Sequence, residues 1–170
     1  MATSENARER LNRYIDDAIA IEAASITGLK EMADDTKNPG DAALFQEHLA
    51  QTEQQKMRLE EALKARGGEP SGTKQVINKL GVGASQLLHA NKDEEDKATR
   101  FLIEAYTVGS MEVAMYESLI AAADLAGDTE LAQLARDIQS QEDATRKKIM
   151  TRIAPVAQEA MGEARPTVTA

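Results

Sequence analysis

Two segments of the sequence each carry one glutamate inside an otherwise apolar helical stripe. Positions 11, 15, 18, 22, 25, 29 and 32 read Leu, Ile, Ala, Glu, Ser, Leu and Met. Positions 101, 105, 108, 112, 115, 119 and 122 read Phe, Ala, Val, Glu, Met, Leu and Ala. Spacings that alternate between four and three residues place side chains on one face of an α-helix. We therefore predict that Glu22 and Glu112 face a helical core, where an uncompensated carboxylate is unfavourable by several kcal/mol.

The composition fits a single all-α domain. A chain of 170 residues is long enough for one hydrophobic core and short for two. Aromatic residues make up only 3% of the sequence, whereas Ala, Leu, Glu and Gln are abundant, which favours helices over sheets. We predict one domain over residues 1–161 and a disordered tail over residues 162–170.

Charge and hydropathy exclude several classes of partner. The net charge of −9, without clustered Lys or Arg, argues against nucleic acid. The sequence contains no apolar run of about 18 residues, so we expect no membrane helix. The N-terminus lacks the basic and then apolar pattern of a signal sequence, so the expected location is cytoplasmic. With no cysteine, any site must use carboxylate, imidazole or amide groups.

Helix-start and helix-stop residues divide the chain into four long helices. Asn38-Pro39 separates the first two, Gly67-Gly68 ends the second, and Gly127-Asp128 separates the last two. The expected helices run from Ser4 to about Asp35, from Pro39 to about Arg66, from a capping box at Asn91 and Glu94 to about Ala126, and from Asp128 to about Ala154 before Pro155. The fold class predicted is a four-helix antiparallel bundle of two helical hairpins, with a long crossover at about 67–91 that carries short helical segments.

The two hairpins read as copies displaced by 90 residues. The displacement aligns Glu22 with Glu112, and the turn after the first helix with the turn after the third. It also predicts core stripes at 45, 48, 52, 55, 59 and 62, and at 131, 135, 138, 142, 145 and 149. Helix rise then brings the polar members of all four stripes to one level of the bundle. These are Glu22, Ser25, His48, Thr52, Gln55, Glu112, Glu142 and Thr145.

This polar layer has the chemistry of a site for Fe or Mn. Carboxylates and an imidazole suit these ions, so the candidate ligands are Glu22, His48, Glu112 and Glu142. The side chains expected around them are Thr52, Gln55, Tyr116 and Thr145. Di-iron carboxylate bundles use a Glu from two helices and Glu-x-x-His from two others, but here those pairs read Thr52/Gln55 and Glu142/Thr145. A mononuclear or incomplete dinuclear centre is one interpretation, and a metal-free hydrogen-bonded network is the other.

Three ordered segments resemble the bacterial ferritin-like family typified by YciE and YciF. They are Phe45-x-x-His48-Leu49-x-x-Thr52-x-x-Gln55-x-x-x-Leu59-Glu60, Glu112-x-Ala114-x-Tyr116 and Glu142-x-Ala144-Thr145, within a similarity from about Leu11 to Ile153. The resemblance implies a ferritin-like bundle, often dimeric, linked to stress responses and without a settled activity. It implies that Glu22, His48, Gln55, Glu112 and Glu142 occupy family site positions. Gln51, Gly109 and Gln141 stand where the family commonly has acidic residues.

Two functions follow as hypotheses. The first is a ferritin-like, stress-associated protein whose metal site handles Fe or Mn, or supports redox chemistry on oxygen or peroxide. The second is a metal-free structural or interaction protein with the same fold. The sequence carries no hydrolase or transferase signature, and it leaves open whether the protein is an enzyme. We also expect a homodimer, because the crossover carries more apolar residues than a short segment can easily bury, namely Val76, Ile77, Leu80, Leu87 and Leu88.

Overall fold

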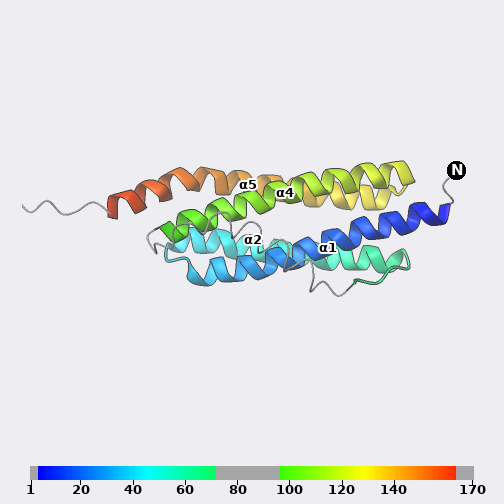
Figure 1. The fold of residues 1–170 in the computed structure, drawn as a ribbon, viewed down its shortest axis with the longest axis horizontal. Coiled ribbons are helices and arrows are strands. Elements are labelled where there is room, and N and C mark those ends of the chain that lie inside the picture. The colour runs from blue at the N-terminus through cyan, green and yellow to red at the C-terminus, as the bar shows by residue number, and fades with distance from the viewer. Residues whose placement is uncertain (1–3, 72–95, 164–170) are drawn as a thin grey trace, which may run out of the picture.

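Four long helices make up the part of the chain that the computed structural model describes, residues 4–71 and 96–163. They are α1 (Ser4–Asp35), α2 (Pro39–Ala65), α4 (Lys97–Ala126) and α5 (Thr129–Glu163). Helix α1 packs against α2 and α4, and α5 packs against α4 and α2. Figure 1 shows an elongated bundle in which each of these neighbouring pairs is antiparallel. The predicted all-α bundle of two helical hairpins is confirmed.

The short connections use the residues that the sequence indicated. The Asn38 side chain caps α2 by accepting hydrogen bonds from the backbone N–H groups of Gly40 and Asp41. Gly67 and Gly127 end α2 and α4 in the left-handed region, with φ values of 73° and 72°, which glycine adopts without a steric penalty. Asp128 then accepts a hydrogen bond from the N–H of Leu131 in the first turn of α5.

The long connection joins opposite ends of the bundle. Helix α2 ends beside the N-terminal end of α1, whereas α4 begins at the far end, where α1 finishes (Figure 1). A tight turn cannot join these two helix ends, which agrees with the predicted long crossover. The capping box at Asn91 and Glu94, the short helical segments and the apolar residues of the crossover lie outside the described residues.

Three of the four predicted core stripes are buried at every position. These are the stripes of α1, α2 and α5, including their polar members. In the stripe of α4, Phe101, Ala105, Glu112 and Leu119 are buried as predicted, and the other three positions are shifted by one residue. Val108 and Met115 are only half-buried, while Gly109 and Tyr116 face the interior. The shift has two causes: Tyr116 reaches a carboxylate in the core, and Gly109 lets α5 approach closely.

Pro155 does not end the fourth helix, and the prediction of an end near Ala154 is wrong. Helix α5 continues through Pro155 to Glu163. Val156 and Ala160 are buried after it, and Val156 joins the apolar cluster at that end of the bundle. Packing of this last segment offsets the hydrogen bond that proline cannot make. The helix covers positions 162 and 163, which the predicted tail included, and residues 164–170 lie outside the described residues.

Replacing Pro155 by alanine should raise the free energy of unfolding by about 1–3 kcal/mol, because the helix regains a backbone donor. Urea denaturation of Pro155→Ala measures the change. Gln158→Ala, at an exposed position of the same segment, is the control and should stay within about 0.5 kcal/mol of the parent. An unchanged Pro155→Ala would mean that the segment after residue 155 contributes little to stability.

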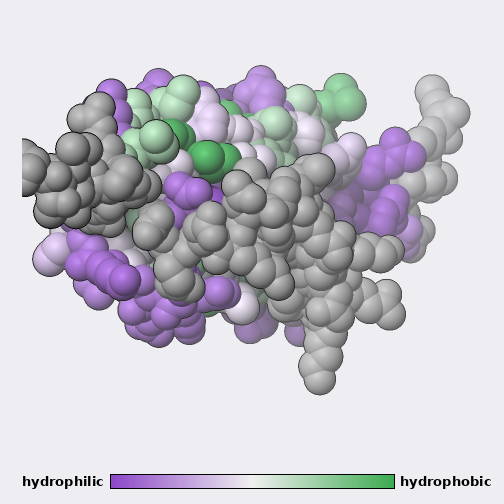
Figure 2. All heavy atoms as spheres, turned by 60° about the vertical axis from the view of Figure 1, so that its left-hand side comes forward, coloured by the Kyte–Doolittle hydropathy of each residue, from purple (hydrophilic) through white to green (hydrophobic). Residues whose placement is uncertain are grey.

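Among the described residues, no helix is long and apolar enough to cross a membrane. On the face in Figure 2, hydrophobic side chains gather on the upper half, which α4 and α5 form, and the lower half is mostly hydrophilic. Leu125, Met150 and Met161 are exposed on these two helices, with exposed fractions of 92%, 53% and 71%.

Candidate metal centre

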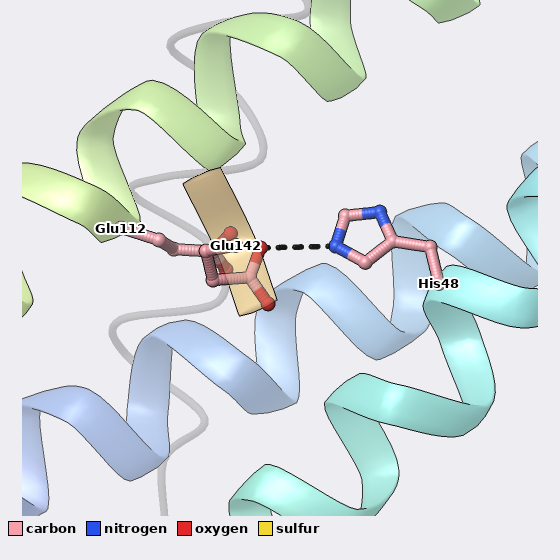
Figure 3. Close-up of side chains that lie close together, drawn as sticks. All are labelled: His48, Glu112 and Glu142. Atoms are coloured by element: carbon pink, nitrogen blue, oxygen red, sulfur yellow. Dashed lines mark hydrogen bonds and ion pairs between the residues drawn. The ribbon is translucent and has the colours of Figure 1, made fainter. Parts of the chain in front are cut away.

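Three of the predicted ligands converge in the interior of the bundle. His48 on α2, Glu112 on α4 and Glu142 on α5 each offer one ligand atom, and these atoms all lie within 4.8 Å of one another. The three residues are 2%, 1% and 1% exposed. His48 Nε2 lies 3.1 Å from Glu142 Oε2, and Figure 3 shows Glu112 pointing toward the same place from the opposite side.

The fourth predicted ligand, Glu22, lies outside this group. It is fully buried on α1, and its Oε1 accepts a hydrogen bond from the Tyr116 hydroxyl of α4. Glu112 receives the matching bond in the other direction, because Ser25 of α1 donates to its Oε1 at 2.5 Å. One oxygen each of Glu22 and Glu112 therefore accepts a hydrogen bond across the α1–α4 interface.

The second oxygen or nitrogen of each of these groups has no hydrogen-bond partner. The orphaned atoms are Glu22 Oε2, His48 Nδ1, Glu112 Oε2 and Glu142 Oε1. Buried polar atoms in native proteins almost always have a partner, and leaving one unpaired costs about 1–3 kcal/mol. Of these atoms, Glu112 Oε2 and Glu142 Oε1 belong to the converging group, whereas His48 presents Nε2, not the orphaned Nδ1, to Glu142 (Figure 3). These two carboxylate oxygens are suited to a positively charged occupant.

Burial and mutual repulsion raise the pKa values of the two repeat-related glutamates. Burial raises the pKa of Glu22 to about 8, the charge of Glu142 adds to this, and the hydrogen bond from Tyr116 opposes it. Burial also raises the pKa of Glu112 well above its usual range, with further increases from Glu22 and Glu142. Without a cation, Glu22 therefore holds a proton at neutral pH, and the pKa of Glu112 is shifted in the same direction.

The metal-free protein should lose stability as the pH rises from about 5 to about 8. The pKa of Glu22 is about 8 in the folded chain against 4.5 as its ordinary value, so over this range the folded chain holds a proton that the unfolded chain has released. The free energy of unfolding then falls with pH, by at most about 1.4 kcal/mol per pH unit for each such proton. Urea denaturation with chelator at several pH values measures the slope. Glu22→Gln should flatten it, and an unchanged slope would contradict the assignment.

The side chains expected around the ligands have different roles. Tyr116 contacts Glu22 directly. Thr52 donates to the backbone carbonyl of His48 at 3.0 Å, so it supports the helix turn that presents the imidazole. Gln55 donates to Gln141 at 3.2 Å, and Thr145 donates to Gln51 at 3.1 Å. These two bonds lie beside the site without touching the three converging groups.

Gly109 lies beside Glu142, at a position that the sequence marked only as a departure from the family pattern. A Cβ at this position would lie 3.3 Å from Arg146 Cβ and 4.0 Å from Glu142 Oε2. A side chain at this position would therefore require Arg146 to shift by a few tenths of an ångström. No sequence pattern indicated this close approach.

The internal repeat is visible in the hydrogen bonds between α2 and α5. A displacement of 90 residues converts the Gln55–Gln141 pair into the Thr145–Gln51 pair. The same operation converts His48–Glu142 into Ile138–Thr52, which offers no charged ligand. The polar centre is therefore one-sided.

This one-sidedness decides which metal centre the residues fit. Two carboxylates, each with an orphaned oxygen, and the Nε2 atom of an imidazole can hold a single Fe or Mn ion. A complete dinuclear centre would need carboxylate or imidazole ligands where Thr52, Gln55 and Thr145 stand. The donor set fits a mononuclear centre and does not fit a complete dinuclear one.

Comparisons with solved structures show the same fold. A protein from Xanthomonas campestris has a TM-score of 0.77 and 23% identity, covering 93% of this chain and 97% of its own. The E. coli stress protein YciF has a TM-score of 0.77 and 21% identity, covering 93% and 99%. The Desulfovibrio desulfuricans bacterioferritin, described with a diiron site, has a TM-score of 0.74 and 15% identity, covering 93% and 86%.

The sequence comparison identifies the family. No curated protein matches the chain. Residues 6–161 match the family described as "Domain of unknown function (DUF892)". The ferritin-like fold and the YciF structure agree with the resemblance noted in the sequence. The chain is a ferritin-like bundle protein and belongs to the DUF892 family.

Proposed function

We propose that this protein binds one Fe or Mn ion inside the bundle and serves a metal-handling or redox role. The observation that carries the proposal is the convergence of His48, Glu112 and Glu142 within 4.8 Å, all buried. The orphaned carboxylate oxygens Glu112 Oε2 and Glu142 Oε1 add to it, because an ion would compensate atoms that otherwise lack partners. Such an ion would supply one-electron chemistry on oxygen or peroxide.

The protein's own residues would orient and insulate that ion. Ser25 fixes one oxygen of Glu112, which leaves the other oxygen for the centre. Thr52 holds the backbone at His48. Glu22, with Tyr116 donating to it, adds a second buried carboxyl group that can hold a proton next to the ligands.

A metal-free structural or interaction protein is the second candidate. It is favoured by the hydrogen bond between His48 and Glu142, at 3.1 Å, and by the raised pKa values of Glu22 and Glu112. Protonated carboxyl groups joined to the imidazole, Ser25 and Tyr116 form a network that needs no ion. Such a network would fix the register of the four helices.

We further propose a stress-associated, cytoplasmic homodimer. The name of the E. coli stress protein YciF supports the stress association. The apolar crossover residues in the sequence and the exposed Leu125, Met150 and Met161 support self-association. Light scattering at micromolar concentration tests the dimer, and a monomer mass would refute it.

Elemental analysis tests the metal proposal. Protein purified without chelator or affinity metal should carry Fe or Mn approaching one ion per chain, and Glu142→Gln should carry almost none. The helix content of both proteins, measured by circular dichroism, controls for folding. Zn alone would correct the identity of the ion, and metal-free wild type that takes up neither Fe(II) nor Mn(II) would favour the network.

A further inference from the structure

Polar side-chain pairs cross the seam between α2 and α5 along its whole length. Helices α2 and α5 approach each other less closely than α1 and α2 or α4 and α5 do, so side chains span the gap. The pairs are Asp41–Arg152, Glu47–Lys148, His48–Glu142, Gln51–Thr145, Gln55–Gln141, Arg58–Asp137 and Arg66–Asp128. One of these pairs, His48–Glu142, belongs to the candidate metal centre.

The two uncharged pairs of this seam lead from the surface to the centre. Gln141 is exposed and Gln51 is half-buried, whereas their partners Gln55 and Thr145 are 1% and 4% exposed. Gln141 directly precedes Glu142 in the sequence, so the exposed glutamine and the buried candidate ligand lie on the same turn of α5. Gln55 Oε1 is buried without a partner, and this row of amides and hydroxyls is therefore not fully satisfied.

The energetics favour opening at these pairs over opening elsewhere. A neutral hydrogen bond contributes only about 0.5–1.5 kcal/mol net, because water replaces the lost partner. Separating apolar helix faces instead exposes surface at about 25 cal/mol per Å². Local opening follows the least stable contacts of a structure. The uncharged part of the α2–α5 seam meets this condition, while ion pairs hold the seam at both ends.

We propose that the α2–α5 seam is the entry route to the buried centre, opening at the Gln51–Thr145 and Gln55–Gln141 hydrogen bonds. The species that fits it is a small hydrated divalent cation. Amide and hydroxyl oxygens can replace water around such an ion one at a time without trapping it as carboxylates would. The net charge of −9 favours approach of cations. This inference rests on the proposed function only for the identity of the species, a divalent cation, that passes through the seam.

Thiol labelling tests the opening without any metal, because the chain has no cysteine of its own. Thr145→Cys places a thiol in the seam, and Ala135→Cys places one on the same helix inside the apolar core, where Ala135 is 0% exposed. We expect the thiol at 145 to react with a small maleimide at least about tenfold faster, with a rate that changes little at low urea. Equal rates with the same steep urea dependence would mean global unfolding exposes both thiols, and would overturn the proposal.

Metal uptake tests the route. Gln51→Leu and Gln141→Leu, which remove the outer partners of the two pairs, should slow Mn(II) loading at least about tenfold while changing the equilibrium affinity less than about threefold. Gln139→Leu, which removes a residue that contacts α4 instead, is the control and should load at the wild-type rate. Unchanged loading in both seam variants would overturn the route. If the thiol at position 145 reacts fast but the protein binds no metal, the opening of the seam is supported and the proposed function is refuted.

Discussion

Glutamine in place of Glu112 should stabilise the metal-free protein at pH 8 by about 1–3 kcal/mol. The glutamine Oε1 can still accept from Ser25, and its amide group can donate to Glu142 where Glu112 Oε2 has no partner. The substitution also removes a buried group whose pKa lies well above its usual range, so the cost of ionising it disappears. Thermal melts at pH 8 with chelator measure the stability of the metal-free proteins.

The sign should reverse when metal is present. Binding to the folded state adds about 2.7 kcal/mol at a ligand concentration one hundred times the Kd, and only the wild type should gain it on adding Mn(II). With Mn(II) present, the wild type should therefore melt at a higher temperature than Glu112→Gln. Glu117→Gln, an exposed glutamate on the same helix, is the control and should respond to Mn(II) as the wild type does. If Mn(II) does not change the melting temperature of the wild type while Glu112→Gln is stabilised, the metal-free network is supported.

Alanine in place of His48 should weaken Mn(II) or Fe(II) binding by more than about a hundredfold. Changes in residues that only support metal ligands already cost 10–100-fold, and His48 supplies the one imidazole of the group. Without metal, the change leaves Glu142 Oε2 without its partner and opens a cavity, so we expect a loss of about 2–4 kcal/mol in unfolding free energy.

Calorimetric titration with Mn(II) measures the affinity. The chain contains two histidines, so His89→Ala, outside the described residues, is the matched control and should bind like the wild type. His48→Gln can keep a hydrogen bond to Glu142, and it separates loss of a ligand from loss of packing. Full affinity in His48→Ala would show that the imidazole is not a ligand.

Most of the fold could be predicted because each step depends on nearby residues. Asn38-Pro39, Gly67 and Gly127 define helix ends by local backbone chemistry, and the stripes define the buried faces. Pro155 was misjudged for the opposite reason. Its local effect is unfavourable, and only the packing of Val156 against residues far away in the sequence keeps the helix intact.

The height of the site along the bundle could be predicted from the sequence, but the contacts between its side chains could not. The repeat and the helix rise put Glu22, His48, Glu112 and Glu142 at one level, and all four are buried there. Which groups meet depends on helix rotation. The one-residue shift on α4 turns Tyr116 inward to Glu22 and leaves Glu112 facing Glu142 and His48. No periodicity within one helix carries that information.

Anomalous diffraction from crystals grown with Mn(II) tests whether His48, Glu112 and Glu142 bind a metal ion together. We predict one peak inside the bundle, about 2.0–2.3 Å from a ring nitrogen of His48 and from carboxylate oxygens of Glu112 and Glu142, with the His48–Glu142 hydrogen bond broken. A crystal with saturating Mn(II), no interior peak and that hydrogen bond still at about 3.1 Å would contradict it.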